Sequence, residues 1–253
     1  MGDIINRLDI LYKEFHVSLT RNESRVDTKE YDYDGGAKIS LSMDYRFLAV
    51  CEYILHNDKS KFLKILNQSA SLILRMFEEF YAGKSIDHSY LHLSSYKNIL
   101  DGAASGDLEL ARKLAKLVGE RPEDKKQKGF FPYLSYRIRY LTLQDKKNLE
   151  ICLEKCLKER EHKTAKNFRG YSTVVSGVFE KDEKKVNEGF LEILQGHKKL
   201  CRRGSEFSDS EDEVIFLHGL GLANLCLDQG FQLHFKDALI PEDLLFKNST
   251  QIQ

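Results

Sequence analysis

An aspartate followed by one fixed apolar pattern recurs at nearly constant distance along the middle of this sequence. Apolar or small residues occupy positions +4, +7, +8 and +11 after Asp107, Asp145 and Asp182, which is the spacing of a helix with one buried face. The copies begin 145 − 107 = 38 and 182 − 145 = 37 residues apart, and a looser copy begins at Asp58. Because aspartate accepts hydrogen bonds from free backbone N–H groups, each is predicted to cap a helix N-terminus.

A second apolar stretch precedes each of these aspartates, so the repeating unit is predicted to be a helix, a short turn and a second helix. Units of this length bury their apolar faces only when they stack on one another. Only three prolines occur in 253 residues, which leaves long stretches free to form helices. The predicted fold is therefore all-α and built from stacked helical hairpins, either as an α-solenoid-like stack or as an irregular helical array.

The two ends of the chain are predicted to differ from this repeating middle. Residues 1–36 combine an amphipathic helix with a segment that is polar from residue 20 and ends in two glycines, which predicts an N-terminal helix plus a polar linker. Residues 37–246 are predicted to form a single helical-hairpin domain that closes with a short extended segment at residues 231–240. Residues 247–253 are predicted to form a C-terminal tail.

Charge and cysteine content exclude several classes of partner and compartment. Lysine plus arginine equals aspartate plus glutamate, 39 against 39, so no global field attracts nucleic acid or an anionic membrane. No apolar run approaches the roughly 20 residues that span a bilayer, and acids among the N-terminal apolar residues argue against a signal peptide. Five scattered cysteines fit reduced thiols better than a disulfide framework. We therefore predict a cytoplasmic protein with no nucleic-acid or membrane partner.

The sequence shows no signature of a catalytic or metal site. His88 and His92 are four residues apart, as zinc ligands on one helical face would be, but the glutamate of a zinc protease is missing between them. Cys152 and Cys156 fall on the apolar stripe, which indicates buried small residues. No GxSxG, HExxH or paired-carboxylate motif occurs. We predict a protein that is not an enzyme and has no metal or cofactor, with an α-helical hydrolase that uses the two histidines as a remote alternative.

The glycine-rich run at residues 219–223 invites comparison with a phosphate-binding loop. It lacks the Lys-Ser/Thr pair of such loops, and no predicted strand precedes it. Gly219 and Ala223 share one helical face, so the preferred interpretation is that small side chains there let a neighbouring helix approach closely.

The most uneven charge distribution lies between residues 197 and 213. A basic run at residues 197–203 precedes an acidic run at residues 206–213, and compensation of helix dipoles accounts for part of this order. Five acids in eight residues exceed what a helix terminus requires, so the acidic run is a candidate partner-binding loop with an aromatic anchor. On charge alone, a merely solvated turn is the preferred interpretation of this run, and the binding loop is the alternative to it. The candidate partner-binding residues are Glu206, Phe207, Asp209, Glu211, Asp212 and Glu213, with Tyr31 and Tyr33 as further candidates for hot spots.

The last third of the chain contains a distinctive order of features. An apolar helix with glycine and alanine at residues 217–227 leads to Gly230, then to an extended piece, and then to Pro241 shortly before a paired-leucine ending, in the stretch VIFLHGLGLANLCLDQGFQLHFKDALIPEDLLF. This stretch resembles the closing segment of the immunity protein 49 family, and the upstream runs LARKLAKL and KKVNEGFLEILQGHKK are compatible with it. The resemblance covers roughly residues 90–246 and rests on packing motifs, so it carries over no functional residue.

The resemblance implies a function that composition does not show. Members of that family are all-α antidotes encoded beside bacterial polymorphic toxins. The chain is therefore expected to bind a cognate secreted toxin domain, often a nuclease, and to occlude it stoichiometrically without catalysis. The alternative is a tetratricopeptide-like adaptor that binds a peptide or protein partner. Against that alternative, the chain has no tryptophan and its copies are 37 and 38 residues apart, whereas those repeats run near 34.

Overall fold

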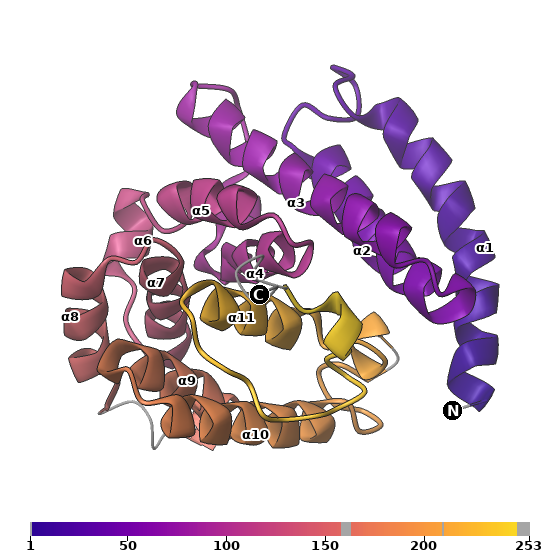
Figure 1. The fold of residues 1–253 in the computed structure, drawn as a ribbon. Helices are drawn as coiled ribbons and strands as arrows, with labels where there is room; N and C mark the ends of the chain where they lie inside the picture. Colours follow the sequence, from indigo (N-terminus) through magenta and orange to yellow (C-terminus); the bar gives the residue numbers. More distant parts are fainter. Residues whose placement is uncertain (1, 158–162, 209, 247–253) are drawn as a thin grey trace, which may run out of the picture. The chain divides into compact units, whose positions relative to one another are not determined.

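A computed structural model of the protein describes residues 2–157, 163–208 and 210–246 (Figure 1). These residues form helices and connecting turns, with one isolated antiparallel bridge between Asp237 and Ile240 and no strand. The predicted all-α class, an array of packed helices, is confirmed. None of the helices in the described ranges is both long enough and apolar enough to cross a bilayer.

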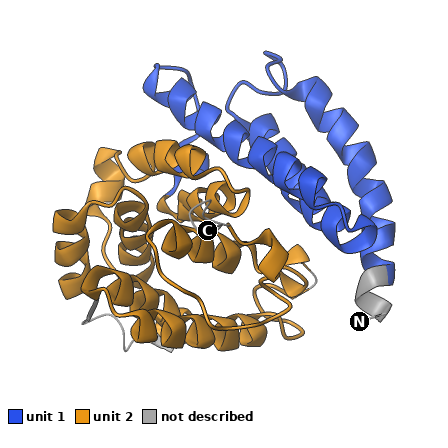
Figure 2. Ribbon diagram, viewed as in Figure 1, with its two compact units in different colours: residues 1–92 blue, residues 93–253 orange. Residues whose placement is uncertain are grey.

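The chain divides into two compact units, residues 1–92 and residues 93–253 (Figure 2). The boundary lies inside the span 37–246, which the sequence predicts as one domain. Unit 1 is built from the following helices: α1 (Gly2–Arg25), α2 (Gly36–His56), α3 (Lys59–Tyr81) and the 3-10 helix η1 (His88–Leu91).

Helix α1 is longer than the sequence predicts and includes the first residues of the expected linker. Its last turns are polar, yet Asn22 is buried and donates a hydrogen bond to Asp44 of α2 at 2.6 Å. Ser18 donates to the same carboxylate at 3.1 Å. Because these polar side chains are satisfied against α2, the helix continues to Arg25, and the connection to α2 shortens to residues 26–35.

Unit 2 contains most of the helices, arranged as hairpins around a central apolar helix. Its α-helices in the described ranges are α4 (Tyr96–Ala104), α5 (Leu108–Leu117), α6 (Pro122–Lys126), α7 (Phe130–Thr142), α8 (Lys146–Leu157), α9 (Arg169–Glu180), α10 (Glu183–Leu200) and α11 (Leu217–Asp228). Its 3-10 helices are η2 (Leu93–Ser95), η3 (Lys163–Phe168), η4 (Glu211–Glu213) and η5 (Glu242–Leu244). Helix α4 pairs with α5, α7 with α8, and α9 with α10, while α11 packs on α4.

Helix α11 lies among the hairpins of its unit in Figure 1. Every residue from Leu217 to Cys226 is buried, which is the behaviour of a helix that is apolar all round. A Cβ atom on Gly221 would lie 2.0 Å from the carbonyl oxygen of Leu100 in α4. The predicted packing role of residues 219–223 is confirmed, but Gly221, rather than Gly219, makes the close backbone approach.

The repeated aspartate marks one recurring turn between the two helices of each hairpin. Each carboxylate accepts a hydrogen bond from the backbone N–H three residues later, at 2.8 to 3.1 Å, as predicted for N-caps. The residue before each aspartate ends the first helix with a positive φ: Asn57, Gly106, Gln144 and Lys181. The four capped turns follow α2, α4, α7 and α9, so the sequence period corresponds to successive hairpins.

Candidate functional site

The acidic loop, defined as residues 206–213, connects α10 to α11 and is anchored by an aromatic side chain. Phe207 is buried, with its ring 5.3 Å from that of His197 and under the ammonium group of Lys97 at 5.6 Å. The backbone N–H of Phe207 donates to the carbonyl oxygen of Leu200 at 2.9 Å. Phe207 therefore holds the loop onto unit 2 and does not present its ring to a partner.

His197 fixes the other end of the same loop. Its imidazole is buried and stacks on Phe216 with ring centroids 3.8 Å apart, and its Nε2 lies 2.7 Å from the carbonyl oxygen of Asp212. Asp212 is itself buried. One side chain from the last turns of α10 thus contacts both ends of the loop and holds Phe207 and Asp212 in place.

The remaining acids of the loop lie at or near the surface. The side chain of Glu206 is 48% exposed, and its carboxylate is 3.8 Å from the ammonium of Lys97. Glu211 and Glu213 are partly exposed in η4. Asp209, also a predicted binding residue, lies outside the described residues. The structure therefore brings five of the six predicted residues into one loop and leaves three carboxylates accessible.

Cys201 adds the only grouping near the loop that resembles a catalytic pair in the described ranges. Its Sγ lies 3.3 Å from Nε2 of His197. Burial raises the pKa of the Cys201 thiol to about 11, and the charges of Asp212 and Glu213 add to the shift. A nucleophilic cysteine requires the opposite shift, toward a thiolate at neutral pH. The arrangement favours a protonated thiol that packs against the loop.

The histidine pair singled out by the sequence does not share a helical face. His88 begins the four-residue helix η1 and stacks edge-on with Phe80 at 5.3 Å, while His92 follows that helix with an extended backbone. Cys152 is buried and its thiol donates to the carbonyl oxygen of Tyr133, while the side chain of Cys156 lies outside the described residues. Within the described ranges, no three His, Cys, Asp or Glu side chains gather as a metal site.

The tyrosine candidates lie in the connection between α1 and α2 of unit 1. Tyr31 and Tyr33 are 50% and 69% exposed. The connection is fixed by Lys38, a buried lysine whose ammonium contacts Asp32 and lies 3.2 Å from Glu79. Burial by itself lowers the pKa of Lys38, but its hydrogen bonds to Asp32 and Glu79 outweigh that effect and raise it. These ion pairs place both tyrosines on a fixed segment.

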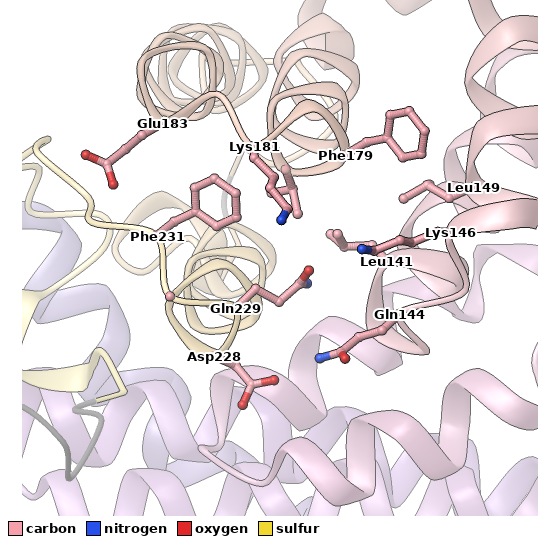
Figure 3. A pocket seen from close by; sticks show the side chains of 12 residues that line it. Leu141, Gln144, Lys146, Leu149, Phe179, Lys181, Glu183, Asp228, Gln229 and Phe231 are labelled. Atoms are coloured by element: carbon pink, nitrogen blue, oxygen red, sulfur yellow. The ribbon is translucent and has the colours of Figure 1, made fainter.

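A second candidate site, which the sequence does not predict, is an open pocket of about 750 Å³ at the other end of α10 and α11 (Figure 3). Three chain reversals form it: the α7–α8 turn at Gln144, the α9–α10 turn at Lys181, and the turn after α11 at Gly230. Each of these residues has a positive φ. The only sequence signals for this site are the turns themselves, because its wall residues are spread over residues 141–231.

We found no match to the chain among protein-family models, among curated proteins or among solved structures. The likeness to the immunity protein 49 family therefore stays a prediction from the quoted motifs. The acidic loop and the pocket are two candidate sites in the described part of unit 2.

Proposed function

We propose that this protein is a cytoplasmic immunity protein that binds a secreted bacterial toxin domain through the acidic loop and occludes it stoichiometrically. The observation that carries the proposal is the anchoring of the loop by Phe207 and His197. Residues that are already held in place lose little conformational entropy on binding, which favours a tight complex. The resemblance of residues 90–246 to the immunity protein 49 family supports the same function.

The charge of the loop fits one class of toxin. Glu206, Glu211 and Glu213 place three carboxylates at or near the surface, so the complementary surface is basic. A nuclease has such a surface, since its cleft must attract a phosphate backbone. Opposite charges across an interface raise the association rate and suppress binding to the wrong partners.

The first experiment is a tagged pull-down from cells that encode the chain, with bound proteins identified by mass spectrometry. The expected result is one near-stoichiometric partner, the toxic C-terminal domain of a secreted protein, whose toxicity disappears when the two are co-expressed. Several substoichiometric partners, or none, would contradict the proposal. A stoichiometric partner without toxicity would contradict it as well.

The second experiment tests the loop with charge reversals at its exposed and partly exposed acids, Glu206→Lys, Glu211→Lys and Glu213→Lys. Asp212 is left unchanged because its burial makes reversal there a test of folding. The association rate with the toxin is expected to fall about tenfold to a hundredfold at low salt. The matched control reverses Glu109, Glu150 and Glu154, three exposed acids of α5 and α8, and should change the rate little. Equal losses in both triple variants would remove the loop assignment.

The alternative function is a helical-hairpin adaptor that binds a peptide. The pocket at the three turns favours it, because an open cavity of about 750 Å³ is large enough for a short peptide segment. The same pull-down separates the two functions, since an adaptor is expected to capture non-toxic partners.

A further inference from the structure

The pocket of Figure 3 has an apolar wall beside a polar one. Leu149 and Val178 are buried where they line it, and Phe231 is half-buried on the opposite side. The amide side chains of Gln144 and Gln229 lie on the polar side (Figure 3). Apolar contact area combined with a few groups that donate and accept hydrogen bonds is typical of sites that bind a peptide or a small ligand.

Two lysines give this pocket its charge. Lys146 lies in the first turn of α8 and Lys181 in the turn before α10, and Figure 3 shows their ammonium groups directed into the same space. Neither ammonium forms an ion pair with any residue that the structure describes. Lys146 near the N-terminus of α8 opposes the dipole of that helix, whereas Lys181 also caps the C-terminus of α9.

The carboxylates of the pocket, in contrast, already have partners. Asp228 pairs with Arg112 at 2.6 Å. Glu183 accepts a hydrogen bond from the backbone N–H of Gln232 at 3.0 Å and lies 3.3 Å from the His234 ring, and its carboxylate points away from the centre of the pocket in Figure 3. The charged groups of the pocket that have no ion-pair partner among the described residues are therefore the two lysines.

We propose that this pocket binds a segment of a partner protein in which an acidic side chain stands next to an aromatic or aliphatic one. The acidic group would contact Lys146 and Lys181, and the apolar side chain would pack on Phe231, Leu149 and Val178. The two glutamines would pair with the peptide backbone. A nucleic acid fits less well, because its repeated phosphates would lie near the carboxylate of Asp228. Its charged backbone would also make no favourable contact with the apolar wall. The inference deepens the alternative adaptor function of this pocket and rests on it. Because the site is separate from the acidic loop, loss of toxin binding and loss of peptide binding can be told apart.

The probe is a set of fluorescein-labelled, terminally blocked pentapeptides that place Glu or Asp next to Phe, Tyr or Leu in every order. Binding to the full chain is measured by fluorescence anisotropy. The comparison peptides carry Gln and Asn in place of the acids. Peptides with acids are expected to bind more tightly by up to about fivefold for each ion pair formed, because an exposed ion pair contributes up to about 1 kcal/mol.

The decisive variants are Lys146→Gln and Lys181→Gln, singly and together. Each is expected to weaken binding of the best acidic peptide about threefold to fivefold, and the pair about tenfold or more, from the same ion-pair energies. The matched control is Lys147→Gln with Lys184→Gln, two exposed lysines on the same helices that do not line the pocket. Phe231→Ala tests the apolar wall and is also expected to weaken binding. Far-UV circular dichroism and thermal melts confirm that each variant is folded.

Three results would overturn the inference. One is the absence of any acidic peptide with a Kd below about 1 mM. Another is an equal loss of binding in the control pair, which would indicate general electrostatic attraction. The last is tighter binding of a labelled ten-nucleotide single strand that is also lost in the Lys146 and Lys181 variants, which would assign the pocket to nucleic acid.

Discussion

The acidic loop and the pocket of Figure 3 lie at opposite ends of α10. The chain assembles them in different ways. Helix α10 has 18 residues, so the two ends are about 27 Å apart at the rise of an α-helix. The loop is one continuous run of acids, whereas the pocket combines three turns far apart in sequence. Continuity made the loop visible in the sequence, but it did not show which of its residues are accessible, since Phe207 and Asp212 are buried.

The extended segment after α11 connects the two ends. Phe231 lines the pocket, Phe235 stacks on Phe190 of α10 with ring centroids 4.8 Å apart, and the carbonyl oxygen of Leu239 accepts a hydrogen bond from the N–H of Phe216. Figure 1 shows this segment running alongside α10. The two ends therefore share a core and the extended segment after α11. They differ in the charge that each presents to a partner, acidic at the loop and basic at the pocket.

The largest expected effect comes from breaking the core that both ends share. In Gly221→Ala the new Cβ would clash with the Leu100 carbonyl oxygen, 2.0 Å away, and we expect a loss of about 3 kcal/mol or more in the free energy of unfolding. Gly102→Ala is the graded control, because its nearest contact, Ala111, is at 3.3 Å and alanine favours the helix by about 1 kcal/mol. Urea denaturation measures both. Similar losses of unfolding free energy in the two variants would show that the close approach of α11 to α4 at Gly221 is not required.

The next effect should be confined to the loop end. His197→Ala removes the stacking on Phe216 and the hydrogen bond to the Asp212 carbonyl oxygen, and is expected to cost about 2 to 3 kcal/mol of stability. His234→Ala, at the pocket end, removes a ring that is mostly exposed and should cost less than about 0.5 kcal/mol. Peptide binding at the pocket should survive in the folded His197→Ala protein. Loss of that binding would mean that the two ends are coupled.

Substitutions of the N-cap aspartates change the stability of the pocket end by graded amounts. Asp182→Ala removes the carboxylate that accepts from the Lys185 N–H at 3.0 Å, with an expected cost of about 1 kcal/mol. Asp182→Asn keeps an acceptor and should lose much less. Asp58→Ala removes the equivalent cap in unit 1, so it should lower stability by a similar amount while pocket binding is unchanged. Equal stability of the Ala and Asn variants at residue 182 would show that the cap contributes nothing.

The smallest effect is a pH dependence at the loop end. Because the pKa of Cys201 is about 11 in the folded protein, against 9.0 when unperturbed, the unfolded state ionises first as the pH rises. The stabilisation is therefore fully present below pH 9 and is lost between about pH 9 and pH 11. The thiol is partly exposed, so we expect a loss of no more than about 1 kcal/mol. Urea titrations at pH 8 and pH 10.5 should show a steeper decline than in Cys201→Ala; parallel declines would contradict the assignment.

Much of the helical array could be predicted because its determinants are local. The offsets after Asp107 and Asp182 predicted both the buried face of a helix and the cap that begins it, and the structure confirms both. After Asp145 the cap is confirmed, and Leu149 and Cys152 are buried as predicted. The end of α1 was misjudged, because Asn22 looks like a linker residue until Asp44 is beside it. The interval between His88 and His92 would place both on one face of an α-helix, but His88 begins a short 3-10 helix and His92 follows it.

The sequence by itself determined the all-α class, the hairpin turns and the location of the acidic loop, because periodicity, capping and charge act over a few neighbouring residues. Only the tertiary structure decided that Phe207 and Asp212 are buried, that Gly221 makes the backbone approach to α4, and that Lys146 and Lys181 face one space. These outcomes depend on which helices become neighbours. Which helices become neighbours depends on how apolar faces far apart in sequence pack together. No local sequence pattern shows which face packs on which.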